Sequence, residues 1–283
     1  MTRSLRDRIR EGTERLCLRY ALRDVEHRNP ILVYQMGKVG SSTVTRTLAS
    51  LGLSEPVLHL HTLNPETLRR AVERQRASVR PRLHTHLLVS ERLIPRLPFP
   101  CRVITLVRDP VARAISFVFE DRWKKVPEAV QGDGSVDAGR VRHKVLELLE
   151  GENGIADPTR WFDSELHEML GIDVFARPFD HERGYQILEQ GGVSALVLRL
   201  EDLNRVLAPA LAAFLDLPEE RIHVARANVG EGKAYGASLR EVKATLQLPE
   251  ALLDRIYATR YARHFYAEEI EAFQDRWRRR DET

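Results

Sequence analysis

A glycine-bearing loop between an apolar run and a helical pattern holds the residues of this chain best suited to bind an anion. The sequence Ile31-Leu-Val-Tyr-Gln-Met-Gly-Lys-Val-Gly-Ser-Ser-Thr43 begins like a buried strand, and helical spacing follows over 43–51. Backbone N–H groups at a helix start bind anions without any side chain, and glycine lets the backbone curl around the ligand. Lys38 adds a positive charge. We therefore predict a phosphate-type site formed by Gly37, Lys38, Val39, Gly40, Ser41, Ser42 and Thr43.

A second apolar run is followed by an arginine and a serine that also suit an anion. Residues 103–107 predict a buried strand, Asp109 is a good helix N-cap, and Pro110 suits the first helical position. Arg108 would then lie at the carboxyl end of a strand, where open α/β sheets bind ligands. Ser116 follows about two helical turns later. Because guanidinium and hydroxyl groups both donate to phosphate oxygens, the pair predicts a second phosphate contact.

The order Lys38-Val-Gly-Ser-Ser-Thr differs from a Walker A motif, in which the lysine directly follows the last glycine. It resembles the 5′-phosphosulfate loop of sulfotransferases, which use 3′-phosphoadenosine 5′-phosphosulfate (PAPS) as donor. In these enzymes an Arg and a Ser with the spacing of Arg108 and Ser116 bind the donor's 3′-phosphate. The resemblance implies PAPS as co-substrate. It also implies a P-loop-type α/β fold of three layers, with a central, mostly parallel sheet flanked by helices.

Two His-x-His pairs supply candidate proton acceptors, since histidine titrates near neutrality. In cytosolic and in hexuronic 2-O-sulfotransferases the base is a His that precedes the 3′-phosphate Arg, and this resemblance implies His86 as the base. His84 is the alternate base or orients the acceptor, and His61, which shares the predicted strand 57–61 with His59, could approach the same site. A metal site is the other interpretation; we predict none, because sulfuryl transfer needs no metal and no cysteine cluster lies nearby.

Several segments are similar to a narrower group, the bacterial family of capsular polysaccharide synthesis proteins, which itself resembles sulfotransferases. They are Lys38-Val-Gly-Ser-Ser, Arg108-Asp-Pro, Trp161-Phe-Asp-x-Glu, Leu198-Arg-Leu-Glu-Asp-Leu203 and Arg260 to Ile270, so the resemblance spans about 30–273. It implies a hydroxyl of a carbohydrate or polysaccharide as acceptor. The Trp161 segment has no assigned chemistry: Trp161 and Phe162 fit a core, and Asp163 and Glu165 fit caps or pairs. Candidates for the cleft near a strand end are Arg199, Glu201 and Asp202.

A late glycine-bearing segment, Ala227-Asn-Val-Gly-Glu-Gly-Lys-Ala-Tyr-Gly236, is comparable with the basic loop that closes over the donor in sulfotransferases. The resemblance implies Lys233 as a donor contact, with Asn228, Gly230 and Tyr235 beside it. An ordinary glycine-rich surface loop is the alternative. Residues 124–139 predict a second loop, suited to an active-site lid or to a plain surface connection.

Composition and length fit one globular domain. The 283 residues predict a single domain, with a helical extension over 1–28, whose amphipathic helix covers 5–25, and a core over about 30–273. The net charge of +3 gives no case for nucleic-acid binding. No apolar run approaches the ~20 residues that span a bilayer. The first 28 residues lack a signal-peptide core, and two distant cysteines suit a reducing compartment, so we expect a cytoplasmic protein.

Strand-like and helical patterns alternate along the chain, which predicts a mostly parallel sheet with right-handed crossovers. Helices are expected from Asn64-Pro65 to about Val79, over 142–149, over 161–171 and over 203–215. Short strands are expected over 84–88, 172–175 and from Ser194.

Two other functions remain open from the sequence. A P-loop kinase or NTPase would need a magnesium-holding acid at a strand end, for which Asp109 and Asp202 are available. A non-catalytic nucleotide-binding protein would keep the donor cleft but lack the acceptor site. No oligomeric state is predicted.

Overall fold

The computed structural model describes residues 12–13, 16–19, 22–23, 25–77, 83–97, 99–120, 125–132, 134–151, 154–225 and 234–278. Most of the predicted N-terminal helix lies outside this range. So do Lys233, Asn228 and Gly230 of the predicted donor-closing loop, and part of the predicted 124–139 loop.

A five-stranded sheet forms the centre of the fold, in the order β2-β1-β3-β5-β4. The first four of these strands run parallel, and β4 pairs antiparallel with β5. The strands are β1 (Ile31–Tyr34), β2 (Val57–Leu60), β3 (Cys101–Val107), β4 (Tyr185–Gln190) and β5 (Val193–Arg199). Every residue of β1 is buried, as expected for a central parallel strand covered on both faces.

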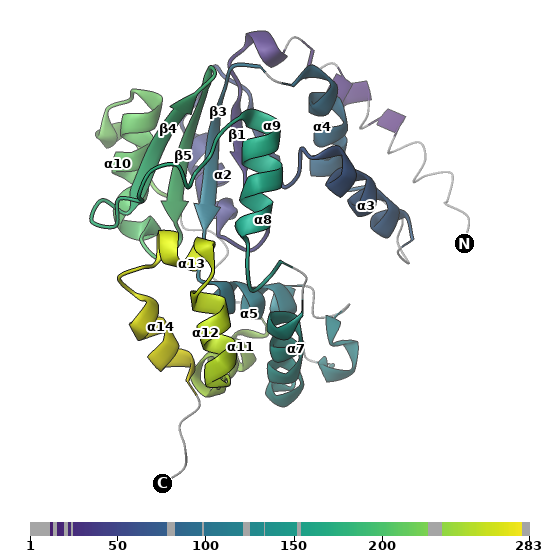
Figure 1. The fold of residues 1–283 in the computed structure, drawn as a ribbon. Coiled ribbons are helices and arrows are strands. Elements are labelled where there is room, and N and C mark those ends of the chain that lie inside the picture. The colour runs from purple at the N-terminus through teal and green to yellow at the C-terminus, as the bar shows by residue number, and fades with distance from the viewer. Residues whose placement is uncertain are drawn as a thin grey trace.

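Helices cover both faces of this sheet (Figure 1), which confirms the predicted three-layer α/β arrangement with a mostly parallel sheet. One long helix lies in front of the strands in that view, and α2 lies behind them. The front helix is built from α8 (Thr159–Trp161), the π-helical η4 (Phe162–His167) and α9 (Glu168–Leu170). The other elements around the sheet are η1 (Val25–His27), α2 (Ser41–Ser50), α3 (Pro65–Arg76), α4 (Thr85–Leu93), η2 (Ile94–Arg96), α10 (Leu203–Leu215) and η5 (Glu219–Arg221).

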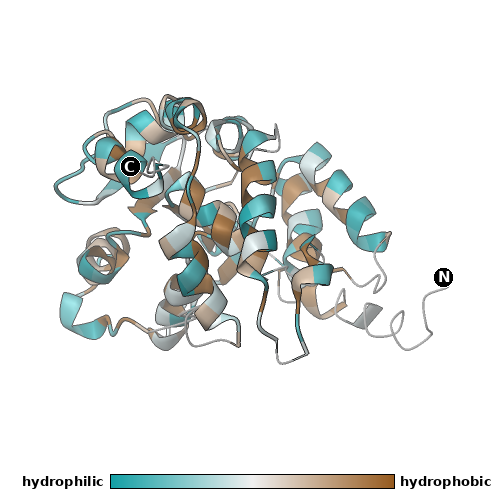
Figure 2. Cartoon of the chain, turned by 90° about the horizontal axis from the view of Figure 1, so that it is seen from below, coloured by the Kyte–Doolittle hydropathy of each residue, from teal (hydrophilic) through white to brown (hydrophobic). Residues whose placement is uncertain are grey.

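A second group of helices lies below the carboxyl ends of the parallel strands and has its own hydrophobic cluster. Figure 2 views the molecule from this end and shows hydrophilic residues along the outer sides of the helices. The group contains α5 (Pro110–Glu120), η3 (Pro127–Ala129), α7 (Ala138–Glu150), α11 (Gly236–Thr245), α12 (Glu250–Tyr257), α13 (Arg260–Phe265) and α14 (Ile270–Trp277). Among the described residues, no helix combines the length and the apolar character that crossing a bilayer requires.

Several predicted boundaries are confirmed. The side chain of Asn64 accepts hydrogen bonds from Glu66 N and Thr67 N, so it caps α3 as expected. Asp109 likewise accepts from Ala112 N at 2.7 Å, directly before α5 begins at Pro110. The helices predicted over 142–149, 161–171 and 203–215 are present, and Gly171 ends the second of them at a φ of 73°.

Two predicted strands are wrong, and β4 was not predicted. Residues 84–88 begin helix α4, whose apolar side packs on α3, because a short apolar run fits a helix as well as a strand. Residues 172–173 are irregular and 174–175 lie in a turn, where Phe175 N donates to Asp173 Oδ1 at 2.8 Å. Aspartate side chains favour such turns over strand pairing.

Candidate functional site

The predicted phosphate loop lies between β1 and α2 and has an unusual backbone. Lys38 has a φ of 71° and Gly40 a φ of 91°, so both adopt the left-handed conformation. This conformation is strained for lysine, and such strain clusters at ligand-binding sites. Gly40 is the N-cap of α2 and, having no side chain, makes no cap hydrogen bond to the first turn of that helix. The first turn of α2 is therefore suited to bind an anion.

Both the neighbouring side chains and the positive φ require glycine at position 40. A Cβ at this position would lie 2.4 Å from Leu200 Cδ1, whereas one at Gly37 would have nothing within 4 Å. We expect Gly40→Ala to lower the free energy of unfolding by about 1–2 kcal/mol, because an L-residue is strained at this φ. Gly37→Ala is the matched control and should change stability less. Chemical denaturation measures both, and equal stability of the two variants would contradict this account of the loop.

Two arginines from the β3–α5 unit hold the loop by its carbonyl groups. Arg108 Nη1 donates to Lys38 O at 3.1 Å, and Arg113 Nε donates to Gly37 O at 3.2 Å. Arg113 is buried and also donates to the carbonyl of Ile155 at 3.3 Å. The structure therefore brings Lys38 and Arg108 together. Arg113 had no predicted role, although an arginine on the buried face of an amphipathic helix is a signal that could have indicated one.

The backbone of Arg108 is held by a tyrosine far away in the sequence. Tyr261 Oη accepts from Arg108 N and donates to Arg108 O, both at 2.8 Å. The next residue, Asp109, donates its N–H to Glu201 at 2.9 Å, and its carboxylate accepts from Tyr257 Oη at 2.6 Å. Burial lowers the pKa of the Arg108 guanidinium, and the charges of Glu201 and Asp109 act against that shift. Arg108 is thus held at the end of β3 by residues far away in the sequence. Tyr261 is 153 positions from Arg108, and Glu201 is 92 positions from Asp109.

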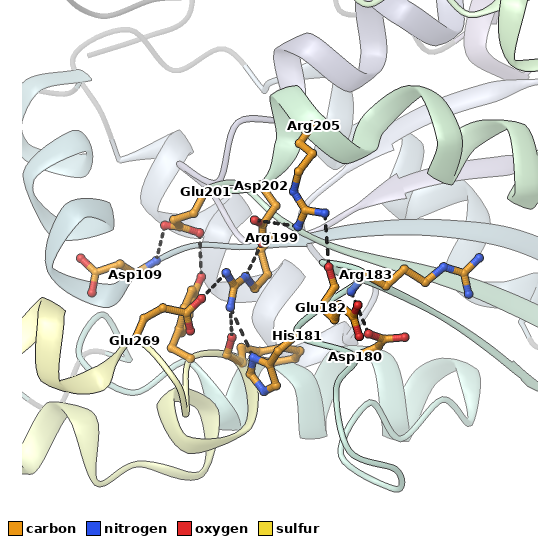
Figure 3. A network of polar contacts seen from close by, with 12 residues as sticks. Asp109, Asp180, His181, Glu182, Arg183, Arg199, Glu201, Asp202, Arg205 and Glu269 are labelled. Carbon is orange, nitrogen blue, oxygen red and sulfur yellow. Dashed lines mark hydrogen bonds and ion pairs between the residues drawn. The ribbon is translucent and has the colours of Figure 1, made fainter.

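Arg199, the last residue of β5, and the acids Glu201 and Asp202 that follow it belong to a network of polar contacts (Figure 3). Arg199 is buried, pairs with Asp202 at 2.6 Å and with Glu269, and donates to Phe265 O at 3.0 Å. Asp202 also pairs with Arg205 at 3.1 Å. Burial raises the pKa of Glu201, which accepts from Tyr266 Oη at 3.1 Å. The three cleft candidates at the end of β5 are therefore engaged by protein groups.

Ser116 lies on α5 about two turns after its start and is partly buried. It shares a helix face with Ala112, one turn closer to Arg108. Tyr235 of the predicted donor-closing segment is buried and stacks on Phe119 at 5.2 Å between ring centroids, which places it in a hydrophobic core.

The four histidines form a row beside the glycine loop. Ring centroids are 4.7 Å apart for His59 and His61, 5.0 Å for His61 and His86, and 5.4 Å for His86 and His84. His61 lies directly after β2, while His84 and His86 lie at the start of α4. The structure thus brings together the two His-x-His pairs that are separate in the sequence. Among the described residues, no group of three or more His, Cys, Asp or Glu is arranged to hold a metal ion.

Hydrogen bonding fixes one of these rings. His61 Nδ1 lies 2.8 Å from Gln35 O, and a carbonyl can only accept, so Nδ1 carries a proton and the lone pair of neutral His61 is on Nε2. Burial lowers the pKa of His61, and the charges of Lys38 and His84 lower it further. Burial and the neighbouring imidazoles lower the pKa of His86 to about 3. Both rings are therefore neutral at pH 7, and the low pKa makes the free imidazole of His86 a weak base.

The front helix contacts the segment that directly follows β2. Trp161 Nε1 donates to His61 O at 3.2 Å, and its ring meets Tyr34 edge-on at 5.3 Å between centroids. Glu165, in the π-helical part, is buried and accepts several hydrogen bonds from the segment after His61. Phe162 is buried in the core. Glu165 was predicted to act as a cap or in a pair; in the structure it accepts hydrogen bonds from uncharged groups, and no sequence pattern indicated these partners.

Comparison with known proteins gives one match. Residues 140–267 match the family NKWYS, described as "Putative capsular polysaccharide synthesis protein". No curated protein and no solved structure matches the chain. The matched segment includes Trp161, Glu165 and Tyr261, whereas the glycine loop, the histidine row and Arg108 precede it. The predicted likeness to sulfotransferases stays a prediction. Over residues 140–267 the chain is similar to this capsular polysaccharide family.

Proposed function

We propose that the protein is a PAPS-dependent sulfotransferase that transfers a sulfuryl group to a hydroxyl group of a carbohydrate or polysaccharide. The observation that carries the proposal is the convergence of the glycine loop with Arg108, through the 3.1 Å hydrogen bond from Arg108 Nη1 to Lys38 O. An α2 N-terminus, a lysine and a guanidinium then lie at one edge of the sheet, as one phosphorylated nucleotide would require. The match to a capsular polysaccharide family supports a carbohydrate acceptor.

The chain's donors fit the two ends of PAPS. The N–H groups of residues 39–43, with the hydroxyls of Ser41, Ser42 and Thr43, would bind the 5′-phosphosulfate. Arg108 and Ser116 would bind the 3′-phosphate and so position the donor. Gly37 and Gly40 allow the close approach of the backbone. Lys233 would contact the donor from the segment that lies outside the described residues.

Transfer requires a proton acceptor and stabilisation of charge. The donor supplies a sulfuryl group, whose sulfur forms a bond to the acceptor oxygen while its bond to the 5′-phosphate oxygen breaks. His86 takes the proton of the acceptor hydroxyl, with His84 and His61 as the alternates. Lys38 stabilises the negative charge that develops on the bridging oxygen. Bound PAPS would bring negative charge near the imidazoles, which favours their protonated form and strengthens the base.

The contacts of two acids distinguish this proposal from a magnesium-dependent kinase or NTPase. The carboxylate of Asp109 accepts from Tyr257 Oη and from Ala112 N, at 2.6 and 2.7 Å. Asp202 is paired with Arg199 and Arg205. Both carboxylates are thus engaged in contacts with other protein groups.

A thermal-shift experiment tests the donor class. At a hundredfold excess over Kd, 3′,5′-diphosphoadenosine should stabilise the protein by about 2.7 kcal/mol and raise its Tm by several degrees. ATP with magnesium, at the same concentration, should shift the Tm less. A larger shift with ATP and magnesium, dependent on the metal, would favour the NTPase instead.

A further inference from the structure

Glu165 connects the two chain segments that lead into the candidate site. Its side chain is 1% exposed and has four hydrogen-bond donors around it. They are the hydroxyl of Tyr34, the hydroxyl of Thr62 at 2.7 Å, Leu63 N at 2.7 Å and Asn64 N at 2.8 Å. Tyr34 is the last residue of β1, directly before the glycine loop, and the other three donors directly follow His61. One carboxylate therefore ties the end of β1 to the end of β2.

The same contacts reach two of the four histidines of the row, His61 and His86. Trp161, one helical turn before Glu165, donates from Nε1 to His61 O at 3.2 Å. Thr62 bonds Glu165 through its hydroxyl, and its carbonyl accepts from Ser90 Oγ at 2.6 Å. Ser90 Oγ also lies 3.0 Å from His86 O, at the start of α4. The path from Glu165 thus runs through Thr62 and Ser90 to the backbone of His86.

The helix that carries Glu165 departs from regular α geometry at this point. Residues Phe162–His167 are π-helical, between the α-helical turns Thr159–Trp161 and Glu168–Leu170. A π-turn accommodates one extra residue and changes the direction in which side chains leave the helix, and such turns often occur at functional sites. Here the turn contains the residue whose carboxylate is aimed at the strand ends.

We propose that Glu165 is a positioning residue, which holds the imidazoles of His61 and His86 against the glycine loop through the segment 62–64 and Ser90. The role rests on the proposed function, in which one of these imidazoles takes the acceptor's proton. A carboxylate is required because all four surrounding groups donate, and an ionised carboxylate only accepts. A glutamine would place its own N–H groups against some of these donors.

Glu165→Gln tests the proposal in the full-length protein. We expect turnover, measured as release of 3′,5′-diphosphoadenosine from PAPS with a polysaccharide acceptor, to fall by about tenfold to a hundredfold, because small displacements of catalytic groups have effects of this size. The calorimetric Kd for 3′,5′-diphosphoadenosine should not change, because Glu165 contacts neither Arg108 nor the glycine loop. Glu168→Gln, at an exposed position on the same helix, is the matched control and should behave as wild type. Equal turnover of the two variants would overturn the proposal.

A spectroscopic measurement separates this inference from the proposed function. With ¹⁵N-labelled histidine, wild-type His61 should show the Nδ1-protonated tautomer that its contact with Gln35 O requires. Glu165→Gln should change the ¹⁵N shifts of His61, and Glu168→Gln should not. If Glu165→Gln does not fold, Thr62→Val removes one donor and leaves the carboxylate in place, and it should alter the same signals. Unchanged His61 shifts in the folded variant would overturn the positioning role, whether or not the protein binds 3′,5′-diphosphoadenosine.

Discussion

His86→Ala is expected to lower the turnover of sulfuryl transfer by about a hundredfold or more, the usual contribution of a general base. The affinity for 3′,5′-diphosphoadenosine should survive, because the ring belongs to the histidine row and the nucleotide contacts come from the loop and Arg108. Only the imidazole is lost, since Ser90 contacts the backbone carbonyl of His86. Release of 3′,5′-diphosphoadenosine measures turnover, and calorimetry measures affinity.

His167→Ala is the control for this variant, because His167 is exposed on the front helix. His61→Ala and His84→Ala complete the series, since either ring is an alternate base. Wild-type turnover in His86→Ala would remove this residue from the mechanism, and a loss confined to His61→Ala would assign the base to His61, whose Nδ1–H is held by Gln35 O.

Arg108→Ala is expected to weaken the binding of 3′,5′-diphosphoadenosine by roughly tenfold to a hundredfold. A hydrogen bond to a charged group contributes about 1.5–3 kcal/mol, and this substitution removes both the guanidinium and its contact with Lys38 O. The backbone position should be retained, because Tyr261 bonds the backbone N–H and carbonyl of residue 108.

Arg102→Ala supplies the control for Arg108→Ala on the same strand. Arg102 lies near the opposite end of β3 and pairs with Glu55 at 3.3 Å. Its removal should leave nucleotide affinity unchanged. Equal calorimetric Kd values for wild type and Arg108→Ala would contradict the assignment of Arg108 to the donor site.

The parts of the fold that were predictable are those with local signals. The strand before the glycine loop is an unbroken apolar run because it is buried on both faces, and Asp109-Pro110 marks the start of α5. The prediction of a strand over 84–88 was wrong because Leu87 and Leu88 fit a buried strand as well as the apolar face of a helix. The antiparallel strand β4 was not predicted at all.

The contacts that position the site could not be predicted, because they join residues distant in the chain. Tyr261 is 153 residues from Arg108, and Glu165 is 131 residues from Tyr34. In the sequence, nothing distinguishes this tyrosine from an ordinary core residue or this glutamate from a helix cap. Residue types and motif order therefore indicated the groups that would do chemistry, whereas the groups that hold them required the structure.

The central claim is that the glycine loop and Arg108 bind opposite ends of one nucleotide. It is tested most directly by comparing the affinities of 3′,5′-diphosphoadenosine and 5′-AMP, which lacks the 3′-phosphate, for wild type and Arg108→Ala. We predict that wild type prefers the diphosphate by at least about tenfold and that Arg108→Ala loses most of this preference, since a residue and the phosphate it contacts do not contribute additively. The same preference in both proteins, or none in wild type, would contradict the account.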